Sequence, residues 1–220
     1  MKTKQKPNQR PIVKRLSPEE REQQIVSKAI TYFATHGFNA STRELAKEIG
    51  ITQPLLYRYF PSKDALVDRV FQVIYLSRWN PDWDGLLRDR SMSLSRRLHL
   101  FYKQYASMIL HSDWIRIFIF AGLTRQGIND RYLASLRERV FNVVLEELRL
   151  EHGVEAPTPQ QYEDEIEFIW GLHAAIFYVG VRKYVYGLPV PDDMDRLVGQ
   201  KLDVFLASAP KALNNLRKAS

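Results

Sequence analysis

Apolar residues recur at helical spacing over almost the whole chain, beginning with residues 18 to 36. The apolar positions of this stretch are Ile25, Val26, Ala29, Ile30 and Phe33. Ser17, Pro18 and Glu20 supply an N-cap, a first-turn proline and a capping-box glutamate. Gly37 follows as a C-cap. The pattern therefore predicts a helix over residues 18 to 36.

Two shorter helices are predicted next. Ser41 and Glu44 form a second capping box, and Gly50 ends the helix that they begin. Its apolar face consists of Leu45, Ala46 and Ile49. Thr52 can cap a third helix with Pro54 in its first turn, where the missing N–H has no helical partner.

The rest of the chain also has the helical period. A fourth helix is predicted over about residues 63 to 79, followed by a polar connection, "NPDWDGLLRDR", at 80 to 90. Further helices are predicted at about 91–111, 112–123, 130–151, 159–185 and 192–208. The last dozen residues are expected to fray. No stretch has a strand period, so the predicted fold is all-α with about nine helices.

Positive charge is concentrated in the first third of the chain. Residues 1 to 75 contain 13 Lys and Arg against 7 Asp and Glu, or +6 of the total of +7. Such an excess is typical of a surface that meets a polyanion. Residues 1 to 16 are basic without apolar periodicity and are predicted to be a disordered arm. The arm either follows a DNA groove or is a solvated tail.

The two short helices joined at Gly50 have the form of a helix-turn-helix. Glycine allows the sharp turn, and small Ala46 allows the helices to approach each other closely. The second helix of such a motif enters the DNA major groove. We therefore expect a DNA-binding domain at residues 17 to 79 and a second helical domain at 80 to 220.

The segment "STRELAKEIGITQPLLYRYFPSK" resembles the DNA-binding signature of the TetR family of bacterial transcriptional regulators. It shows a Thr-x-x-Leu-Ala helix like that of the family, its Gly-Ile turn, its Leu-Tyr-x-Tyr-Phe recognition segment and its Ser-Lys opening of the next helix. Upstream, "AITYFATHGF" matches the family's ending of the first helix. The resemblance covers roughly residues 20 to 75, about a quarter of the chain.

This resemblance implies roles for individual residues at the DNA. The implied phosphate contacts, from hydroxyl, ammonium or backbone N–H groups, are Thr42, Tyr57, Tyr59 and Lys63. The implied base contacts are Arg43, Gln53 and Pro54. An arginine can fork onto guanine, a glutamine onto adenine, and a proline ring can pack on a thymine methyl.

Each of these residues also has a purely structural interpretation. The tyrosines could pack half-buried against the first helix, and Lys63 could be an ordinary solvated lysine. Arg43 could pair with Glu44 or Glu48 on its own helix. Arg58 could form a salt bridge or touch a phosphate.

In the family, the C-terminal helices form a ligand-binding and dimerisation domain, and this is what the resemblance implies for residues 80 to 220. The aromatic candidates for a pocket wall are Tyr102, Tyr105, Trp114, Phe118, Trp170, His173 and Phe177. The helix at 159–185 is apolar on two faces, and the last helix has apolar positions at similar spacing, which suits a four-helix dimer interface. The candidates for that interface are Ile169, Leu172, Ile176, Val179, Leu197, Val198, Leu202 and Phe205. A single thick monomeric core is the alternative.

Other classes of function find little support in the sequence. Nucleotide-binding loops, a nucleophile elbow and the H-E-x-x-H zinc motif are all missing, so we expect neither an enzyme nor a cofactor. A metal site is not expected either, since there is no cysteine and the five histidines are scattered. The longest apolar run, residues 168 to 181, is shorter than a membrane span, and we expect a cytoplasmic protein without a membrane partner.

The sequence thus predicts a homodimeric repressor that binds a palindromic operator on double-stranded DNA and is released by a small hydrophobic or aromatic effector. One alternative is a DNA-binding factor without such an inducer, acting constitutively or through a protein partner. Another is a helical enzyme or carrier that merely contains a helix-turn-helix.

Overall fold

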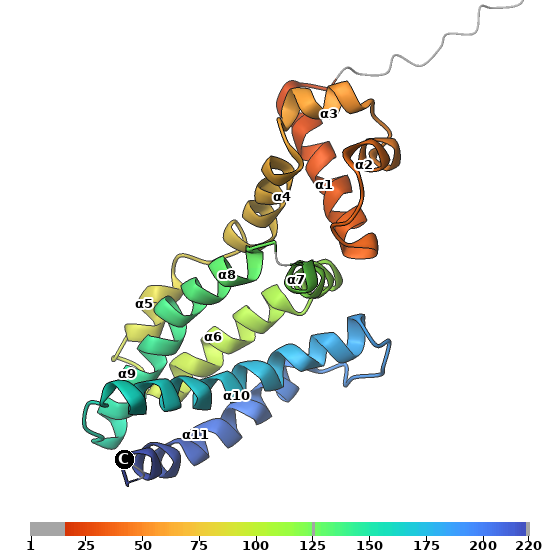
Figure 1. The fold of residues 1–220 in the computed structure, drawn as a ribbon. Coiled ribbons are helices and arrows are strands. Elements are labelled where there is room, and N and C mark those ends of the chain that lie inside the picture. The colour runs from red at the N-terminus through yellow and green to blue at the C-terminus, as the bar shows by residue number, and fades with distance from the viewer. Residues whose placement is uncertain (1–15, 125, 219–220) are drawn as a thin grey trace, which may run out of the picture.

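The computed structural model describes residues 16–124 and 126–218, and in these residues it consists of helices and connections without a strand. The predicted all-α fold is confirmed. The helices at the N-terminal end are α1 (Pro18–His36), α2 (Thr42–Ile49), α3 (Gln53–Tyr59) and α4 (Lys63–Phe71). They gather at one end of the molecule (Figure 1). Apart from Leu16, the predicted basic arm lies outside the described residues.

The remaining helices form an elongated bundle below this end (Figure 1). They are α5 (Trp83–Arg88), α6 (Leu94–Ile109), α7 (Ser112–Thr124), α8 (Ile128–Leu136), α9 (Asn142–His152), α10 (Pro159–Tyr184) and α11 (Met194–Lys218). Short π-helical segments, η1 (Gln72–Leu76) and η2 (Arg137–Phe141), extend α4 and join α8 to α9. In the part of the chain described, no single helix is long and apolar enough to cross a membrane. Only α6 and α7 taken together have that length and composition, with a 76° bend between them.

Side-chain caps set the boundaries of the N-terminal helices, as predicted. Ser17 and Glu20 form a complete capping box before α1, and Ser41 and Glu44 form another before α2. The backbone of Gly50 adopts φ 82°, a left-handed conformation that ends α2. The first three helices therefore begin and end within a residue of their predicted positions.

Two predicted boundaries were wrong on the C-terminal side of α4. The helix predicted to reach residue 79 ends at Leu76, after the π-helical turn η1. The polar connection predicted at residues 80 to 90 contains α5, because Trp83 and Leu87, four positions apart, are buried on one face of a helical turn and a half. The indole of Trp83 donates a hydrogen bond to Gln104 Oε1 at 2.8 Å. With only these two buried positions, α5 is too short to show a periodic pattern.

The last helix is longer than the sequence indicated. α11 continues through Lys218 instead of ending near residue 208, although Pro210 lies inside it. Leu213 is fully buried, and Arg217 forms an ion pair with Glu165 of α10. Glu165 is itself fully buried and also pairs with Arg149 of α9 at 2.5 Å. These long-range contacts hold the segment that was predicted to fray.

The N-terminal helices are joined to the bundle mainly through the contact of α1 with α7. A Cβ atom placed on Gly37, at the end of α1, would lie 2.9 Å from Cδ1 of Phe120 on α7. The Nε of Arg116, also on α7, donates to the carbonyl oxygen of Ala34. The end of α1 therefore rests directly on α7, and the buried apolar core is continuous from α1 to α11.

The residues predicted for the dimer interface are divided between the interior of the chain and an outer groove. Four of its residues pack almost completely inside the chain, because they lie between α10, α11 and the rest of the bundle; they are Ile169, Ile176, Val198 and Leu202. Val179 and Leu172 are also buried. The outward side of α10 and α11 is instead an open groove with a volume of about 530 Å³. Leu172, Leu197 and Phe205 of the predicted set line this groove.

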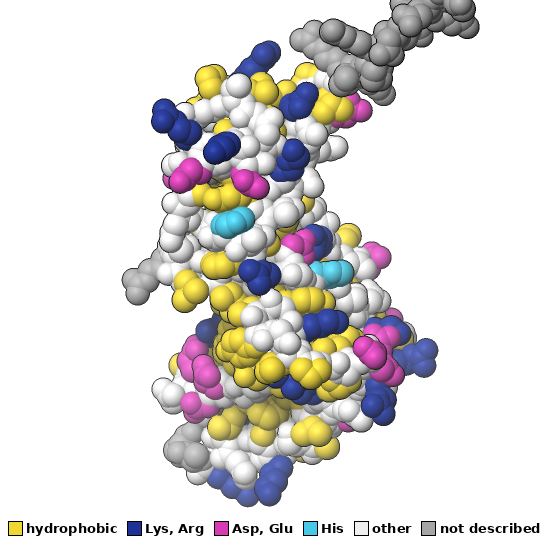
Figure 2. All heavy atoms as spheres, turned by 90° about the vertical axis from the view of Figure 1, so that its right-hand side faces the viewer, with side chains coloured by type: hydrophobic (Ala, Val, Ile, Leu, Met, Phe, Trp, Pro, Cys, Tyr) yellow, Lys and Arg dark blue, Asp and Glu magenta, His cyan; other side chains and the backbone are white. Residues whose placement is uncertain are grey.

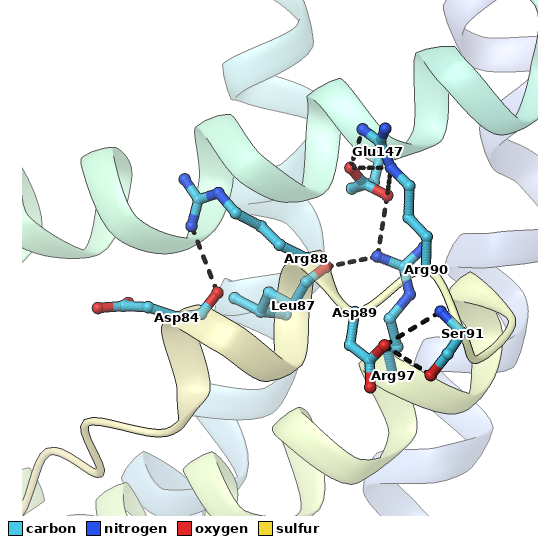
Figure 3. A network of polar contacts seen from close by, with 8 residues as sticks. All are labelled: Asp84, Leu87, Arg88, Asp89, Arg90, Ser91, Arg97 and Glu147. Carbon is cyan, nitrogen blue, oxygen red and sulfur yellow. Dashed lines mark hydrogen bonds and ion pairs between the residues drawn. The ribbon is translucent and has the colours of Figure 1, made fainter.

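A buried ionic network holds α5, α6 and α9 together (Figure 3). The carboxylate of Glu147 on α9 accepts hydrogen bonds from Arg90 at 2.7 Å and from Arg97 at 2.9 Å. Arg97 and Glu147 are each only 5% exposed, and Arg97 also donates to the carbonyl of Leu87. Although burial acts to raise the pKa of Glu147, the hydrogen bonds from Arg90 and Arg97 outweigh it, and the net effect is a lowered pKa.

We expect Glu147→Gln to lower the free energy of unfolding by about 3–5 kcal/mol, because it leaves the buried guanidinium of Arg97 without a countercharge. Urea unfolding at pH 7 measures this change. A folded-state pKa below the ordinary value of about 4.3 means that the ion pair stabilises the protein above that pH and is lost as the pH falls further. The difference between the variant and the parent should therefore shrink on acidification.

Glu163→Gln is the matched control. Glu163 forms an ion pair with Arg137 at 2.6 Å but is 55% exposed, so its loss should change stability by no more than about 1 kcal/mol. Equal effects of the two substitutions at pH 7 would show that the buried network contributes no more than a surface pair.

Candidate nucleic-acid interface

Basic side chains gather on one face of the N-terminal end (Figure 2), although residues 16–75 as a whole contain seven Lys and Arg against seven Asp and Glu. Figure 2 shows Lys and Arg side chains spread over the surface of this end, with fewer acidic ones between them. The helix-turn-helix formed by α2 and α3 lies on this end (Figure 1). A surface of this kind attracts a polyanion such as nucleic acid.

The turn between α2 and α3 is held by hydrogen bonds to the last carbonyls of α2. The N–H groups of Gly50 and Ile51 donate to the carbonyl of Ala46 at 3.0 and 2.9 Å. From α1, the ammonium of Lys28 donates to the carbonyl of Ile49 at 2.6 Å. These bonds satisfy carbonyls that have no partner inside the helix, so they fix the angle between the two helices.

Three of the predicted DNA-contacting side chains form a single hydrogen-bonded chain. The hydroxyl groups of Thr42 and Tyr57 are 3.0 Å apart, and Gln53 Nε2 donates to Thr42 Oγ1 at 2.9 Å. Thr42 is the first residue of α2 and Gln53 the first of α3, so this chain links the start of one helix to the start of the other. Tyr57 is 44% exposed. The amide oxygen of Gln53 is left without a protein partner.

Arg43 and Pro54 are exposed, and Arg43 has neither a hydrogen bond nor an ion pair. Neither of the ion pairs considered for Arg43, with Glu44 or with Glu48, is present among the described residues. Oε2 of Glu44 accepts hydrogen bonds from the backbone N–H and the hydroxyl of Ser41, both at 2.8 Å. These two bonds lower the pKa of Glu44. Arg58 is also exposed and unpaired. The guanidinium of Arg43 is thus free to meet a ligand.

Tyr59 and Lys63 both make contacts within the protein. Tyr59 is half-buried and packs against the core, as the structural interpretation of the tyrosines had it. The ammonium of Lys63 donates to the carbonyls of Phe38 and of Ala40, the latter at 2.8 Å. Lys63 therefore closes the connection between α1 and α2, and the ammonium keeps one N–H for another partner.

The seven residues predicted to contact DNA all lie on α2, on α3 or at the first position of α4. They bring hydroxyl, amide, guanidinium and ammonium groups to one end of a small three-helix unit. These groups can bind phosphate oxygens and the donor and acceptor edges of bases. Their contact with DNA stays a prediction.

The seven residues predicted to line a ligand pocket come together inside the bundle. His173 lies at the centre, with ring centroids 5.3 Å from Trp170, 6.1 Å from Tyr105 and 6.2 Å from Phe177. Phe177 in turn contacts the rings of Trp114 and Phe118, and Tyr105 contacts that of Tyr102. Burial lowers the pKa of His173 to about 4, so its imidazole is neutral near pH 7.

The aromatic cluster includes polar atoms that the sequence analysis did not identify. The Oη atoms of Tyr75 and Tyr102 and the Nε1 of Trp114 are buried without a hydrogen-bond partner. Tyr132, by contrast, shares a 2.9 Å hydrogen bond with Tyr105. Tyr75 and Tyr132 lie on η1 and α8, and no local motif indicates that they meet the predicted aromatic residues. Within the described residues, no group of three or more His, Asp or Glu is placed to hold a metal ion.

Comparison with known proteins connects the N-terminal unit to a family. A sequence model described as "Bacterial regulatory proteins, tetR family" matches residues 25–70. The nucleoid occlusion factor SlmA of Colwellia psychrerythraea is 29% identical over 150 residues, which cover 64% of this chain and 72% of that protein. The uncharacterized HTH-type transcriptional regulator YuxN of Bacillus subtilis is 40% identical over 57 residues, covering 26% of this chain and 20% of that protein.

The whole fold is also similar to a solved structure. A TetR-like transcriptional regulator from Rhodococcus sp. RHA1 superimposes with a TM-score of 0.63, covering 88% of this chain and 99% of the other. The sequence identity is 22%. The likeness therefore extends through the C-terminal bundle, where it concerns the fold alone.

We expect Lys63→Met to lower the free energy of unfolding by about 1–3 kcal/mol, since two backbone carbonyls lose their partner. Urea unfolding measures the change. Lys47→Met is the matched control, because Lys47 is exposed and its ammonium has no hydrogen bond. If both variants were as stable as the parent, Lys63 would have no part in holding the connection from α1 to α2.

Proposed function

Since the chain belongs to the tetR family of bacterial regulatory proteins, whose members bind DNA and form dimers, we propose that it is a repressor that binds a two-fold symmetric operator as a homodimer. A small hydrophobic or aromatic ligand releases it from the operator. Residues 17–79 bind DNA, and residues 80–220 bind the ligand and the second copy. The protein acts in the cytoplasm, together with the DNA.

The observation that carries the DNA-reading part of the proposal is the arrangement at the start of α2 and α3. Gln53 is held by Thr42 and keeps its amide oxygen free, and Arg43 next to Thr42 has no partner. A side chain that is already ordered loses less entropy when it meets a base. Arg43, Gln53 and Pro54 read bases in this proposal, while Thr42, Tyr57, Tyr59 and Lys63 contact phosphates.

The groove between α10 and α11 is the surface at which we propose that two copies of the chain associate. Gly171 and Ala175 of α10 leave room for another helix, and Val204 of α11 is 71% exposed at the same groove. Small residues allow helices to pack closely, and an exposed apolar side chain of this kind gains free energy when it is covered. Leu172, Leu197 and Phe205 line the groove and complete the proposed surface.

The interior aromatic cluster favours the proposal that the protein binds a small ligand. An unpartnered buried hydroxyl or indole N–H costs free energy of about 1–3 kcal/mol, and Tyr75, Tyr102 and Trp114 each carry one. A ligand that entered between these rings and accepted their hydrogen bonds would recover part of that cost. Such a ligand is flat and largely apolar, with one or two acceptor atoms.

A second candidate function rests on the similarity to the nucleoid occlusion factor SlmA, which extends over 64% of this chain. That similarity favours a DNA-binding factor without a small-molecule inducer, acting constitutively or through a protein partner. The two candidates share the DNA-binding surface and differ only in what controls it.

We expect Arg43→Ala and Gln53→Ala to relax the preference at particular base pairs, because each bidentate base contact contributes about 1–3 kcal/mol of discrimination. Selection of bound duplexes from a random library, followed by sequencing, measures the preference. Tyr57→Phe is the control: it should weaken binding to all sequences alike and return the parent motif. An unchanged motif in both alanine variants would remove these residues from base reading.

The same selection tests the dimer. The parent should return two-fold symmetric sites with half-sites one helical turn, or a multiple of it, apart. Val204→Asp places a charge in the groove between α10 and α11 and should return single half-sites. Symmetric sites from this variant would place the dimer surface elsewhere.

We expect neutral aromatic compounds of the right shape to release a labelled operator duplex from the protein, as measured by fluorescence polarisation. Tyr102→Phe removes one of the unpartnered hydroxyls, so it should weaken release by an active compound and leave DNA affinity without the compound unchanged. Failure of a broad panel of such compounds to release the duplex would favour the factor without an inducer.

A further inference from the structure

A cavity lies at the junction between the N-terminal helices and the bundle, away from the buried aromatic cluster. It has a volume of about 550 Å³ and is bounded by α1 on one side and by α7 on the other, with α4 and η1 closing it. We call it the α1–α7 cavity. Its volume falls within the range of about 300–1,000 Å³ that small-molecule sites occupy.

Three arginines line the α1–α7 cavity, and each has N–H groups that form no hydrogen bond within the protein. Arg78 uses only Nη2, in a 2.9 Å ion pair with Asp113, and Arg69 uses only Nε, in a 2.9 Å ion pair with Glu22. Arg116 uses Nε and Nη1 on backbone carbonyls and leaves Nη2 free. Each guanidinium is partly exposed, so an anion in the cavity could reach the unused donors.

The charges around the cavity leave one positive charge unbalanced. Asp113 offsets Arg78 and Glu22 offsets Arg69, while Arg116 is bonded only to neutral carbonyls. In addition, α7 begins at Ser112 on the cavity wall, and the N-terminal end of a helix favours a negative charge. A single negative charge is therefore the charge that the cavity accommodates best.

The opposite wall of the cavity is apolar. It is formed by Val26, Ile30 and Ala34 of α1 and by Val73 of η1. We propose that the α1–α7 cavity binds a small carboxylate that carries an apolar chain, with the carboxylate on the arginines and the chain along this wall. Arginine matches a carboxylate with two parallel hydrogen bonds, which fits the planar guanidinium groups found there.

Carboxylate binding in this cavity would change how the N-terminal helices are held. That this alters DNA binding rests on the proposed function. Arg116 joins the carbonyl of Ala34 near the end of α1 to the carbonyl of Tyr184 at the end of α10, the latter at 3.2 Å. A carboxylate bound at the free Nη2 attracts the same guanidinium into the cavity and away from these two carbonyls. It therefore loosens the end of α1 from α7 and changes how the helix-turn-helix is held relative to the dimer helices.

Isothermal titration calorimetry with octanoate tests the site directly on the full chain without DNA. We expect saturable binding of one octanoate per chain, and binding at least tenfold weaker for octanamide, which has the same chain without the charge. No binding of octanoate, or equal binding of the two compounds, would overturn the proposal.

Two variants locate the binding within the cavity. Arg78→Gln removes one positive charge, and Thr31→Phe fills space from α1 without changing the charge; each should weaken octanoate binding at least fivefold. Arg137→Gln is the control, because Arg137 has a similar surface ion pair with Glu163 outside the cavity. Circular dichroism confirms that each variant is folded. An effect of Arg137→Gln equal to that of both cavity variants would also overturn the proposal.

A DNA-binding measurement then tests the regulatory step. Saturating octanoate should weaken binding of the selected duplex by at least fivefold in the parent, and Arg78→Gln should need at least five times the octanoate concentration for the same effect. Octanoate binding without a change in DNA affinity would leave a site that does not regulate. If the protein bound no duplex even without octanoate, the proposed function would be wrong. The calorimetry would still show whether the cavity binds octanoate.

Discussion

The position of the DNA-binding end depends on one close contact, that of Gly37 with Phe120. Gly37 has φ 73°, and a Cβ there would meet the ring of Phe120 at 2.9 Å, so both the backbone conformation and the available space require glycine. Because α1 ends at this contact, the direction in which the chain enters α2 is fixed by α7. The carbonyls of Phe38 and Ala40, which Lys63 binds, follow directly. The orientation of the helix-turn-helix thus depends on α7, a helix of the bundle.

Local signals in the sequence predicted the N-terminal helices almost to the residue, because capping residues act within four positions of each other. Contacts across long stretches of sequence were not predictable in the same way. The helix α5 depends on the burial of Trp83 and Leu87, and the end of α11 depends on Arg217 reaching Glu165. Neither partner is visible in a local pattern.

In the candidate site, too, local features were predictable from the sequence and long-range contacts were not. The resemblance to a family placed the predicted DNA contacts on α2, on α3 and at the start of α4, since motif and spacing identify positions along a helix. It did not indicate that Gln53, Thr42 and Tyr57 would be bonded to one another. Helical periodicity likewise showed that α10 is apolar on two faces, but it could not tell which face packs inside the chain. The structure assigns Ile169 and Ile176 to the inside and leaves Gly171 and Ala175 at the groove.

The π-helical turn η1 has a consequence for evolution by insertion and deletion. Its backbone bond runs from the N–H of Ser77 to the carbonyl of Gln72, five residues back, so the turn holds one residue more than an α-helical turn. One residue corresponds to a rotation of about 100° around a helix axis. Loss of a single codon from this turn would therefore leave an ordinary α-helical turn. Loss of one codon from the α-helical part of α4 would instead rotate the preceding residues by that angle, so this turn is the place where a change in length disturbs the helix least.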